Sequence, residues 1–317
     1  MTLPLDEGWG ATDIAGVDAA GIDWSRVRRG AFVIHQRITY RYAGPVRRLR
    51  QRLVVLPREH HGDQWRISRS VQVLDAVPKR VRAAVDEFGN HVVDIEVPYV
   101  AERVTFVSWC VVERNLDSPH VAAGALLGDA RLLDPTQLTA PDDALDSLIR
   151  ELRGSGLEQA ELATAACRRI FELMTYAHDV TTVRTTAAEA FAQRQGVCQD
   201  YAHVLLAVTR GLGLPSRYVS GQLLGTGGSH AWVEVLVPDG SGRAHVLALD
   251  PTTGRGAGMT YLTIAVGRDY TDIAPVSGTY VAPHAGVLTM SKCAVVRRVE
   301  ANGGDSADPG ARTAPAL

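Results

Sequence analysis

The chain has 317 residues, of which 46% are hydrophobic and 21% are charged, and its formal net charge is −2. This length exceeds the usual size of one domain and favours two. The charge leaves no basic surplus, which argues against nucleic acid or an anionic membrane as the principal partner, so we expect a small molecule, a peptide or a protein instead.

The cysteines and the start of the chain bear on the compartment. Cys110, Cys167, Cys198 and Cys293 are few and scattered, and none forms a C-x-x-C pair. A disulfide scaffold is therefore not expected, and a reducing compartment fits best. The chain begins without a basic segment or an apolar run, and no apolar stretch is long enough to span a membrane. The sequence therefore predicts a cytoplasmic protein.

Residues 1–29 are rich in glycine, aspartate and alanine, and we interpret them as an N-terminal extension lying on the next domain. Short runs of alternating apolar and polar residues follow at hairpin spacing, which is typical of antiparallel strands. These runs cover residues 32–42, 50–56, 65–74, 79–86, 91–97 and 103–113. So many strands cannot bury both faces of one sheet, so we predict an antiparallel β-sandwich over residues 30–115.

Two clusters in this region invite a functional interpretation. His60 and His61 could ligate a metal, but no third ligand follows at metal spacing, so we interpret them as part of a solvated loop and expect no metal site. A series of arginines could form a basic edge. Charges on an edge strand also prevent aggregation, and we prefer that interpretation. The arginines are Arg47, Arg48, Arg50, Arg52 and Arg58.

The second half of the chain has a mixed pattern. Frequent proline, glycine and aspartate predict a linker over residues 116–141. Helical spacing follows over residues 142–153, 156–177 and 185–191, the last with Thr186 and Glu189 as a capping box. Strand patterns over residues 217–224, 230–237, 244–249, 261–266 and 287–299 predict one antiparallel sheet. We therefore expect an α+β domain over residues 142–300, followed by a disordered tail over 301–317.

Cys198 opens a strongly apolar helix just after Gly196, whose lack of a side chain suits a close backbone turn. In the first helical turn, unpaired backbone N–H groups and the helix dipole favour a thiolate. A single cysteine of this kind is more often a small buried hydrophobe than a nucleophile. The case for a nucleophile therefore depends on what lies near it.

A histidine and an aspartate lie on the two strands that follow. If residues 230–237 and 244–249 form a hairpin about Gly240, His230 faces Asp250 directly. Their Cβ atoms would then lie about 4.5–5.5 Å apart, so the carboxylate could hold one imidazole nitrogen while the other faces the thiol. This is the arrangement of nucleophile, base and orienting carboxylate.

These segments resemble the transglutaminase-like superfamily. The run Gly196-Val197-Cys198-Gln199-Asp200-Tyr201-Ala202-His203 and then residues 213–221, 229–234 and 250–252 follow in the family's order. The resemblance is closest to bacterial members that carry their own N-terminal β domain, and it extends to about residue 298. It implies a papain-like α+β domain with the nucleophile helix packed on an antiparallel sheet. The family's triad falls on Cys198, His230 and Asp250.

The expected reaction is cysteine-dependent acyl transfer on an amide, most simply peptide or isopeptide hydrolysis through a thioester, with no cofactor. Two alternatives stay open: transfer to an amine, and a non-catalytic binding module. The Cys198 backbone N–H and the Gln193 side chain are candidate oxyanion donors, although Gln195 or a tyrosine could serve instead. Trp232 could wall the pocket or belong to the core, and Tyr270 lies in a segment that the resemblance places near the cleft. Substrate identity and oligomeric state stay open.

Overall fold

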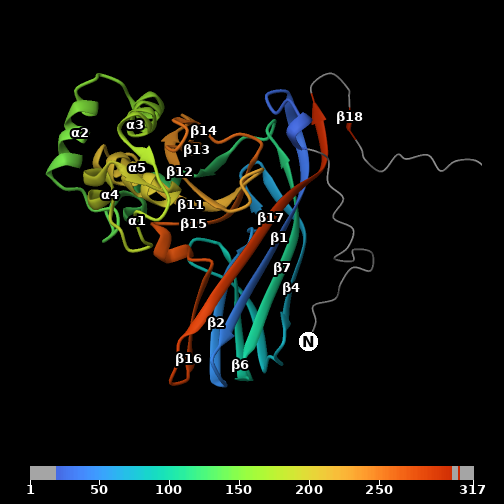
Figure 1. Ribbon diagram of the computed structural model, residues 1–317. Helices are drawn as coiled ribbons and strands as arrows, with labels where there is room; N and C mark the ends of the chain where they lie inside the picture. Colours follow the sequence, from blue (N-terminus) through green and yellow to red (C-terminus); the bar gives the residue numbers. More distant parts are fainter. Residues whose placement is uncertain (1–18, 302–305, 308–317) are drawn as a thin grey trace, which may run out of the picture.

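The computed structural model describes residues 19–301 and 306–307 (Figure 1). Long strands make up one half of the molecule, and helices cover a shorter sheet in the other half. The predicted N-terminal antiparallel sheets are confirmed. Within the described residues, no helix is long and apolar enough to cross a membrane.

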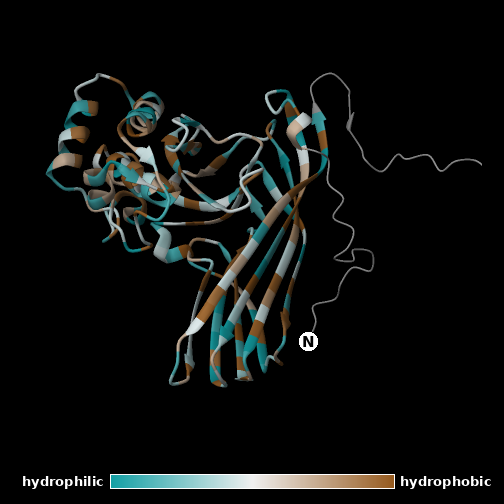
Figure 2. Cartoon of the chain, in the orientation of Figure 1, coloured by the Kyte–Doolittle hydropathy of each residue, from teal (hydrophilic) through white to brown (hydrophobic). Residues whose placement is uncertain are grey.

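Two antiparallel sheets form the half with long strands. One has six strands in the order β18-β17-β1-β7-β4-β3, and the other has four in the order β16-β2-β6-β5. Figure 2 shows apolar and polar residues alternating along these strands, and the apolar side chains of both sheets share one core. The strands from the first part of the chain are β1 (Val27–Tyr42), β2 (Val46–Leu56), β3 (His60–His61), β4 (Gln64–Leu74), β5 (Arg80–Val85), β6 (His91–Val100) and β7 (Arg103–Asn115).

The end of the chain returns to these sheets. β16 (Val276–Val281) pairs with β2, and β17 (Gly286–Ala301) pairs with β1 along almost its whole length. Residues 287–299 are therefore not part of the sheet formed by residues 217–266, and that prediction is wrong. The last part of the predicted domain over residues 142–300 belongs to the N-terminal sheets instead. Local alternation marks a strand but does not specify its partner.

The two predicted terminal segments lie mostly outside the described residues. Of the predicted N-terminal extension over residues 1–29, residues 19–29 are described, and the last three of them already belong to β1. They include η1 (Ala19–Gly21), and Trp24 stacks on Phe32 with ring centroids 6.4 Å apart. Of the predicted disordered tail, Ala301 ends β17, and β18 (Ser306–Ala307) pairs with it. Residues 302–305 and 308–317 of that tail are outside the described chain.

The other half is built on a second antiparallel sheet in the order β14-β13-β12-β11-β15, and a further strand, β8, also pairs with β13. Residues 116–141 are therefore no free linker, because they contain β8 and two short helices, and Leu132 is buried against this sheet. The elements are β8 (Val121–Ala123), η2 (Gly124–Gly128), α1 (Ala130–Leu133), β11 (Ser216–Leu223), β12 (Ser229–Pro238), β13 (Arg243–Asp250), β14 (Arg255–Gly256) and β15 (Tyr261–Gly267).

Helices pack on this sheet around α5 (Cys198–Gly211), which contacts β11 and β12 on one side and α2, α3 and α4 on the other (Figure 1). This position explains why nearly every residue of α5 after its first turn is buried. The remaining elements are α2 (Asp143–Arg153), α3 (Gln159–Leu173), β9 (Thr175–Tyr176), α4 (Ala187–Gln193), β10 (Gln195–Gly196) and η3 (Tyr270–Ile273).

Two details of the helices bear on the site. The capping box of α4 is confirmed, since the Thr186 hydroxyl accepts from the Glu189 N–H and the Glu189 carboxylate accepts from the Thr186 N–H. α3 ends before residue 177, where the prediction placed its end. The chain after it forms β9, which pairs in parallel with β10 just ahead of α5.

Candidate active site

The N-terminus of α5 is held by its own first turn. The Asp200 carboxylate accepts the Val197 N–H at 2.8 Å and the Thr181 hydroxyl at 2.6 Å. Gly196 lies so close to this carboxylate that a Cβ atom there would come within 2.6 Å of the Asp200 Cβ. Cys198 is consequently fixed as the first residue of α5, and it is half-buried.

His230 and Asp250 meet across the β12–β13 hairpin, although in a different register from the one predicted. Val233 pairs with Leu249, so the register is shifted by two residues and His230 lies diagonal to Asp250. A shift of two keeps both side chains on the predicted face, and diagonal neighbours are within reach of long side chains. The His230 Nε2 and Asp250 Oδ2 atoms are 2.8 Å apart.

The imidazole of His230 also forms a hydrogen bond with the Cys198 thiol, so it lies between the sulfur and the carboxylate. Burial alone would lower the pKa of His230. The hydrogen bonds and charges of Asp250 and Cys198 outweigh this effect and raise its pKa to about 9. The geometry therefore favours an imidazolium at neutral pH, as required by a thiolate–imidazolium pair.

Asp250 is held by three further donors that the sequence reasoning did not assign. Burial would raise its pKa, but hydrogen bonds from His230, Thr252 and Tyr261 keep it below the usual value. The Tyr261 hydroxyl donates to Oδ2 at 2.7 Å, and the Thr252 N–H and hydroxyl donate to Oδ1 at 2.9 and 2.7 Å. Thr252 follows Asp250 in a turn pattern that could have indicated this bond. Tyr261 comes from β15, and no local signal pointed to it.

Tyr176 is a third residue that the sequence pattern does not indicate, because that pattern predicts one helix over residues 156–177. The β9–β10 pairing brings it beside Cys198. Its hydroxyl accepts the Cys198 backbone N–H and donates to the thiol, and burial followed by the charge of Cys198 raises the pKa of Tyr176. The N–H group expected to bind an oxyanion is thus occupied by a phenol that is partly exposed to solvent.

The three secondary candidates lie in different surroundings. Gln193 is exposed at the end of α4, and its side chain makes no hydrogen bond to the part of the chain that the structure describes. Trp232 is 1% exposed and stacks on the His230 ring with centroids 6.3 Å apart, so it supports the imidazole as a core residue. Tyr270 is half-buried, and its N–H donates to His203 Nε2 at 3.3 Å.

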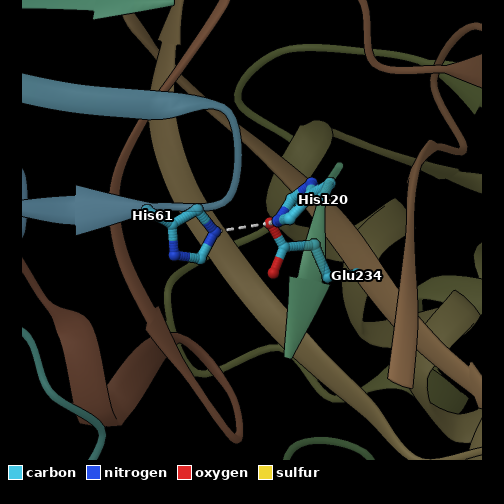
Figure 3. A group of neighbouring side chains, drawn as sticks. All are labelled: His61, His120 and Glu234. Carbon is cyan, nitrogen blue, oxygen red and sulfur yellow. Dashed lines mark hydrogen bonds and ion pairs between the residues drawn. The ribbon is translucent and has the colours of Figure 1, made fainter. Parts of the chain in front are cut away.

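Glu234 of β12 joins the second sheet to the N-terminal sheets through His61 (Figure 3). Arg217 donates to Glu234 Oε2 at 2.7 and 2.6 Å, and His61 Nε2 lies 2.7 Å from Oε1. His61 is 3% exposed, so its interpretation as part of a solvated loop is wrong. The sequence could not show this, since its partner lies 173 residues away.

Ligand atoms, one each from His61, His120 and Glu234, lie within 4.8 Å of one another, close enough to suggest a metal site. Arg58, however, lies 3.2 Å from His61 Nδ1 and can only donate, so Nε2 carries the hydrogen and donates to Glu234. A cation here would also face two guanidinium groups. We therefore interpret this cluster as an ionic network that joins the two halves of the molecule.

One residue of the C-terminal strand β17 also contacts the site. The Lys292 ammonium donates to the hydroxyl of Ser229, the residue before His230, and burial lowers the pKa of Lys292 to about 8. The sequence pattern predicts this strand in the sheet that contains β12. The structure instead brings it to the site from the N-terminal sheets.

Comparison with known proteins identifies related chains for both halves. The transglutaminase-like superfamily profile matches residues 146–242, and the bacterial transglutaminase-like N-terminal region matches residues 32–113. An uncharacterized protein of Mycobacterium leprae is 33% identical over 215 residues, covering 62% of this chain and 75% of that protein. One of Mycobacterium tuberculosis is 37% identical over 121 residues, but the match spans only 38% of its length and 35% of this chain.

A solved structure has the same fold over most of the chain. It is a candidate cysteine protease from Cytophaga hutchinsonii, with a TM-score of 0.68 and 21% identity, and the match covers 86% of this chain and 92% of that one. At this identity the likeness concerns the fold alone. The two profile matches and the M. leprae relative establish that this chain belongs to the transglutaminase-like superfamily and carries its bacterial N-terminal region.

Proposed function

We propose that the chain is a cysteine-dependent amide hydrolase in which Cys198 is the nucleophile, His230 the base and Asp250 the orienting carboxylate. The observation that carries this proposal is the position of the His230 imidazole, between the Cys198 thiol and the Asp250 carboxylate. The candidate substrates are peptides, proteins and small amides.

The reaction needs two acyl-transfer steps. The Cys198 thiolate attacks the amide carbonyl, the C–N bond breaks, and the His230 imidazolium gives its proton to the departing amine. A water molecule then attacks the thioester while His230 accepts its proton, and the acid and the thiolate are released. Asp250 holds Nε2 of the imidazole, so Nδ1 is the nitrogen that exchanges the proton with sulfur and substrate.

The first tetrahedral intermediate needs donors for its oxyanion. The Cys198 backbone N–H at the N-terminus of α5 is one, once the Tyr176 hydroxyl moves away from it. The amide nitrogen of Gln199 is a second candidate, because it is buried and makes no hydrogen bond to any residue that the structure describes. Gln193, which is exposed, is a weaker candidate than Gln199.

A panel of amide substrates tests the proposal by release of amine or ammonia, with wild type compared with Cys198→Ala. We expect turnover by wild type and a loss of at least about 10²-fold in the variant. The matched control is Cys293→Ala, which removes an exposed cysteine and leaves turnover unchanged. Turnover that survives in Cys198→Ala would contradict the proposal.

Transfer to an amine is the competing function within the family, since the same three side chains serve both reactions. Adding a labelled primary amine to a glutamine donor separates the two. Incorporation of the label at the expense of acid release would identify a transglutaminase. Release of acid and ammonia with no label incorporated supports hydrolysis.

A further inference from the structure

The outer face of the four-stranded N-terminal sheet carries charged side chains in a regular order. The strands β16, β2, β6 and β5 lie side by side, so their registers align residues in rows across the sheet. We refer to two of these rows as the arginine rungs. The first contains Thr279, Arg50, Glu96 and Arg80, and the second contains Ser277, Arg52, Asp94 and Arg82.

The arginine rungs line two adjoining grooves of about 540 and 460 Å³, which share Arg50, Glu96 and Thr279. The grooves contain two acidic side chains and six basic ones, an excess of four positive charges on a chain with a net charge of −2. Such an asymmetric charge distribution attracts an anionic partner to this face. The basic residues are Arg48, Arg50, Arg52, Lys79, Arg80 and Arg82.

At least three of these six cations are available to a ligand. Arg52 forms a bidentate pair with Asp94, at 2.8 and 3.1 Å. Arg50, Arg80 and Arg82 are exposed and form no side-chain hydrogen bond or ion pair with the described part of the chain. Protection of a sheet edge does not explain Arg50 and Arg52, because β2 is an internal strand between β16 and β6. The sequence-based interpretation of the β2 arginines as edge charges is therefore wrong.

The spacing of the rungs indicates the kind of anion. Residues two apart on a strand lie about 6.6–6.8 Å apart, and an extended peptide presents alternate side chains on one face with the same repeat. Two carboxylates at alternate positions of such a peptide can therefore lie one on each rung, against its arginines. Asp94 and Glu96 lie within the same rungs, which disfavours a partner with continuous negative charge, such as nucleic acid, more than a peptide whose carboxylates are spaced to meet the arginines.

We propose that this face binds an extended acidic segment of a protein, with carboxylates on alternate residues. The larger groove is connected through the chain to the half of the molecule that contains Cys198. Its wall includes β16, which begins three residues after η3 ends. The Val54 N–H also donates to Pro275, at 3.0 Å, just before β16. An acidic protein bound here would lie next to the half of the molecule that contains Cys198. We infer that such proteins are substrates, an inference that rests on the proposed function.

Fluorescence anisotropy tests the binding directly, using the full chain with Cys198→Ala so that no turnover occurs. The probe is a labelled peptide of alternating Glu and Ser, and its control has Gln in place of Glu. We expect the Glu peptide alone to bind, with an affinity that falls as salt rises. The double variant R80Q/R82Q should weaken binding at least tenfold. The matched double variant R37Q/R41Q removes two exposed arginines from β1, in the other sheet, and should stay within twofold of the parent.

Three results would overturn the proposal: equal binding of the Gln peptide, equal losses in both double variants, or a preference for duplex DNA over the Glu peptide. Thermal unfolding of each variant shows that the fold is intact, which we expect because all four arginines are exposed. The binding assay needs no catalysis. Failure of the hydrolase proposal would therefore appear as peptide binding by a chain whose wild type turns over none of the amide substrates in the panel.

Discussion

At the scale of single residues, the site depends on what surrounds the His230 imidazole. Asp250 lies on one side of the ring, the Cys198 thiol contacts it as well, and Trp232 stacks on its face. These contacts favour a protonated ring that cannot reorient. The same pairing links the stability of the folded chain to pH.

The raised pKa of His230 gives a pH-dependent stability. Its folded-state pKa is about 9, against an ordinary value of 6.5, so the imidazolium stabilises the fold fully below pH about 6.5 and loses this effect as the pH rises through about 9. Urea unfolding should show a decrease of at most about 3 kcal/mol in wild-type stability over that window. His230→Gln should lack this decrease, and His245→Gln, an exposed change on β13, should retain it. Identical pH profiles for the two variants would contradict the assignment.

Tyr176 contacts the Cys198 backbone N–H, which the proposed mechanism assigns to the oxyanion. Its hydroxyl uses the Cys198 N–H and donates to the sulfur, which reduces the nucleophilicity of the thiolate. Removal of one such bond, worth about 1 kcal/mol, should make alkylation of Cys198 by iodoacetamide in Tyr176→Phe about fivefold faster. Tyr201→Phe, at a neighbouring ring, is the control and should change little. A slower reaction in Tyr176→Phe would show that the phenol activates the thiol.

At the scale of elements, the start of α5 is defined by the short chain before it. β10 passes through Gly196, and the Asp200 carboxylate fills the space where a side chain would lie. Glycine is therefore needed at position 196, because any larger residue would collide with the Asp200 side chain that holds the first turn of α5.

Gly196→Ala tests this packing. The new Cβ would lie 2.6 Å from the Asp200 Cβ, so the first turn of α5 must shift. We expect a loss of about 1–3 kcal/mol in stability, as is typical of overpacking, and slower alkylation of Cys198. Gly228→Ala is the control, since nothing lies within 4 Å of the Cβ that it would add. An unchanged alkylation rate in Gly196→Ala would mean that the turn tolerates the shift.

At the scale of the whole molecule, the two halves are joined at several points. Glu234 of β12 pairs with Arg217 and with His61 of the N-terminal sheets, and Lys292 of β17 reaches Ser229. Although burial opposes it, Arg217 and the two histidines hold the pKa of Glu234 well below its usual value. The Glu234 carboxylate is thus ionised and buried, and its stability there depends on its charged and hydrogen-bonded partners.

Glu234→Gln should therefore be strongly destabilising. The substitution leaves the buried Arg217 guanidinium without its counter-charge, which typically costs about 3–5 kcal/mol. Denaturant unfolding measures the loss. Glu151→Gln, which breaks an exposed pair with Arg169, should cost less than about 1 kcal/mol. Equal effects of the two substitutions would argue that the junction contributes no more than a surface pair.

The sequence by itself determined the local elements and the three residues proposed for catalysis. Alternation and helical spacing located most strands and helices, and the even repeat of a strand kept His230 and Asp250 on one face despite a register shift of two residues. The order of the motifs around Cys198 indicated the family, because these residues lie in short continuous segments.

Only the tertiary structure decided which distant segments meet. Several contacts join residues that are far apart in the chain or lie in separate elements. They are the pairing of β17 with β1, the contact of His61 with Glu234, and the contacts of Tyr176 and Tyr261 with the site. Local periodicity reports which side of an element is buried. The identity of the partner depends on the packing of the whole chain, and no local pattern encodes it.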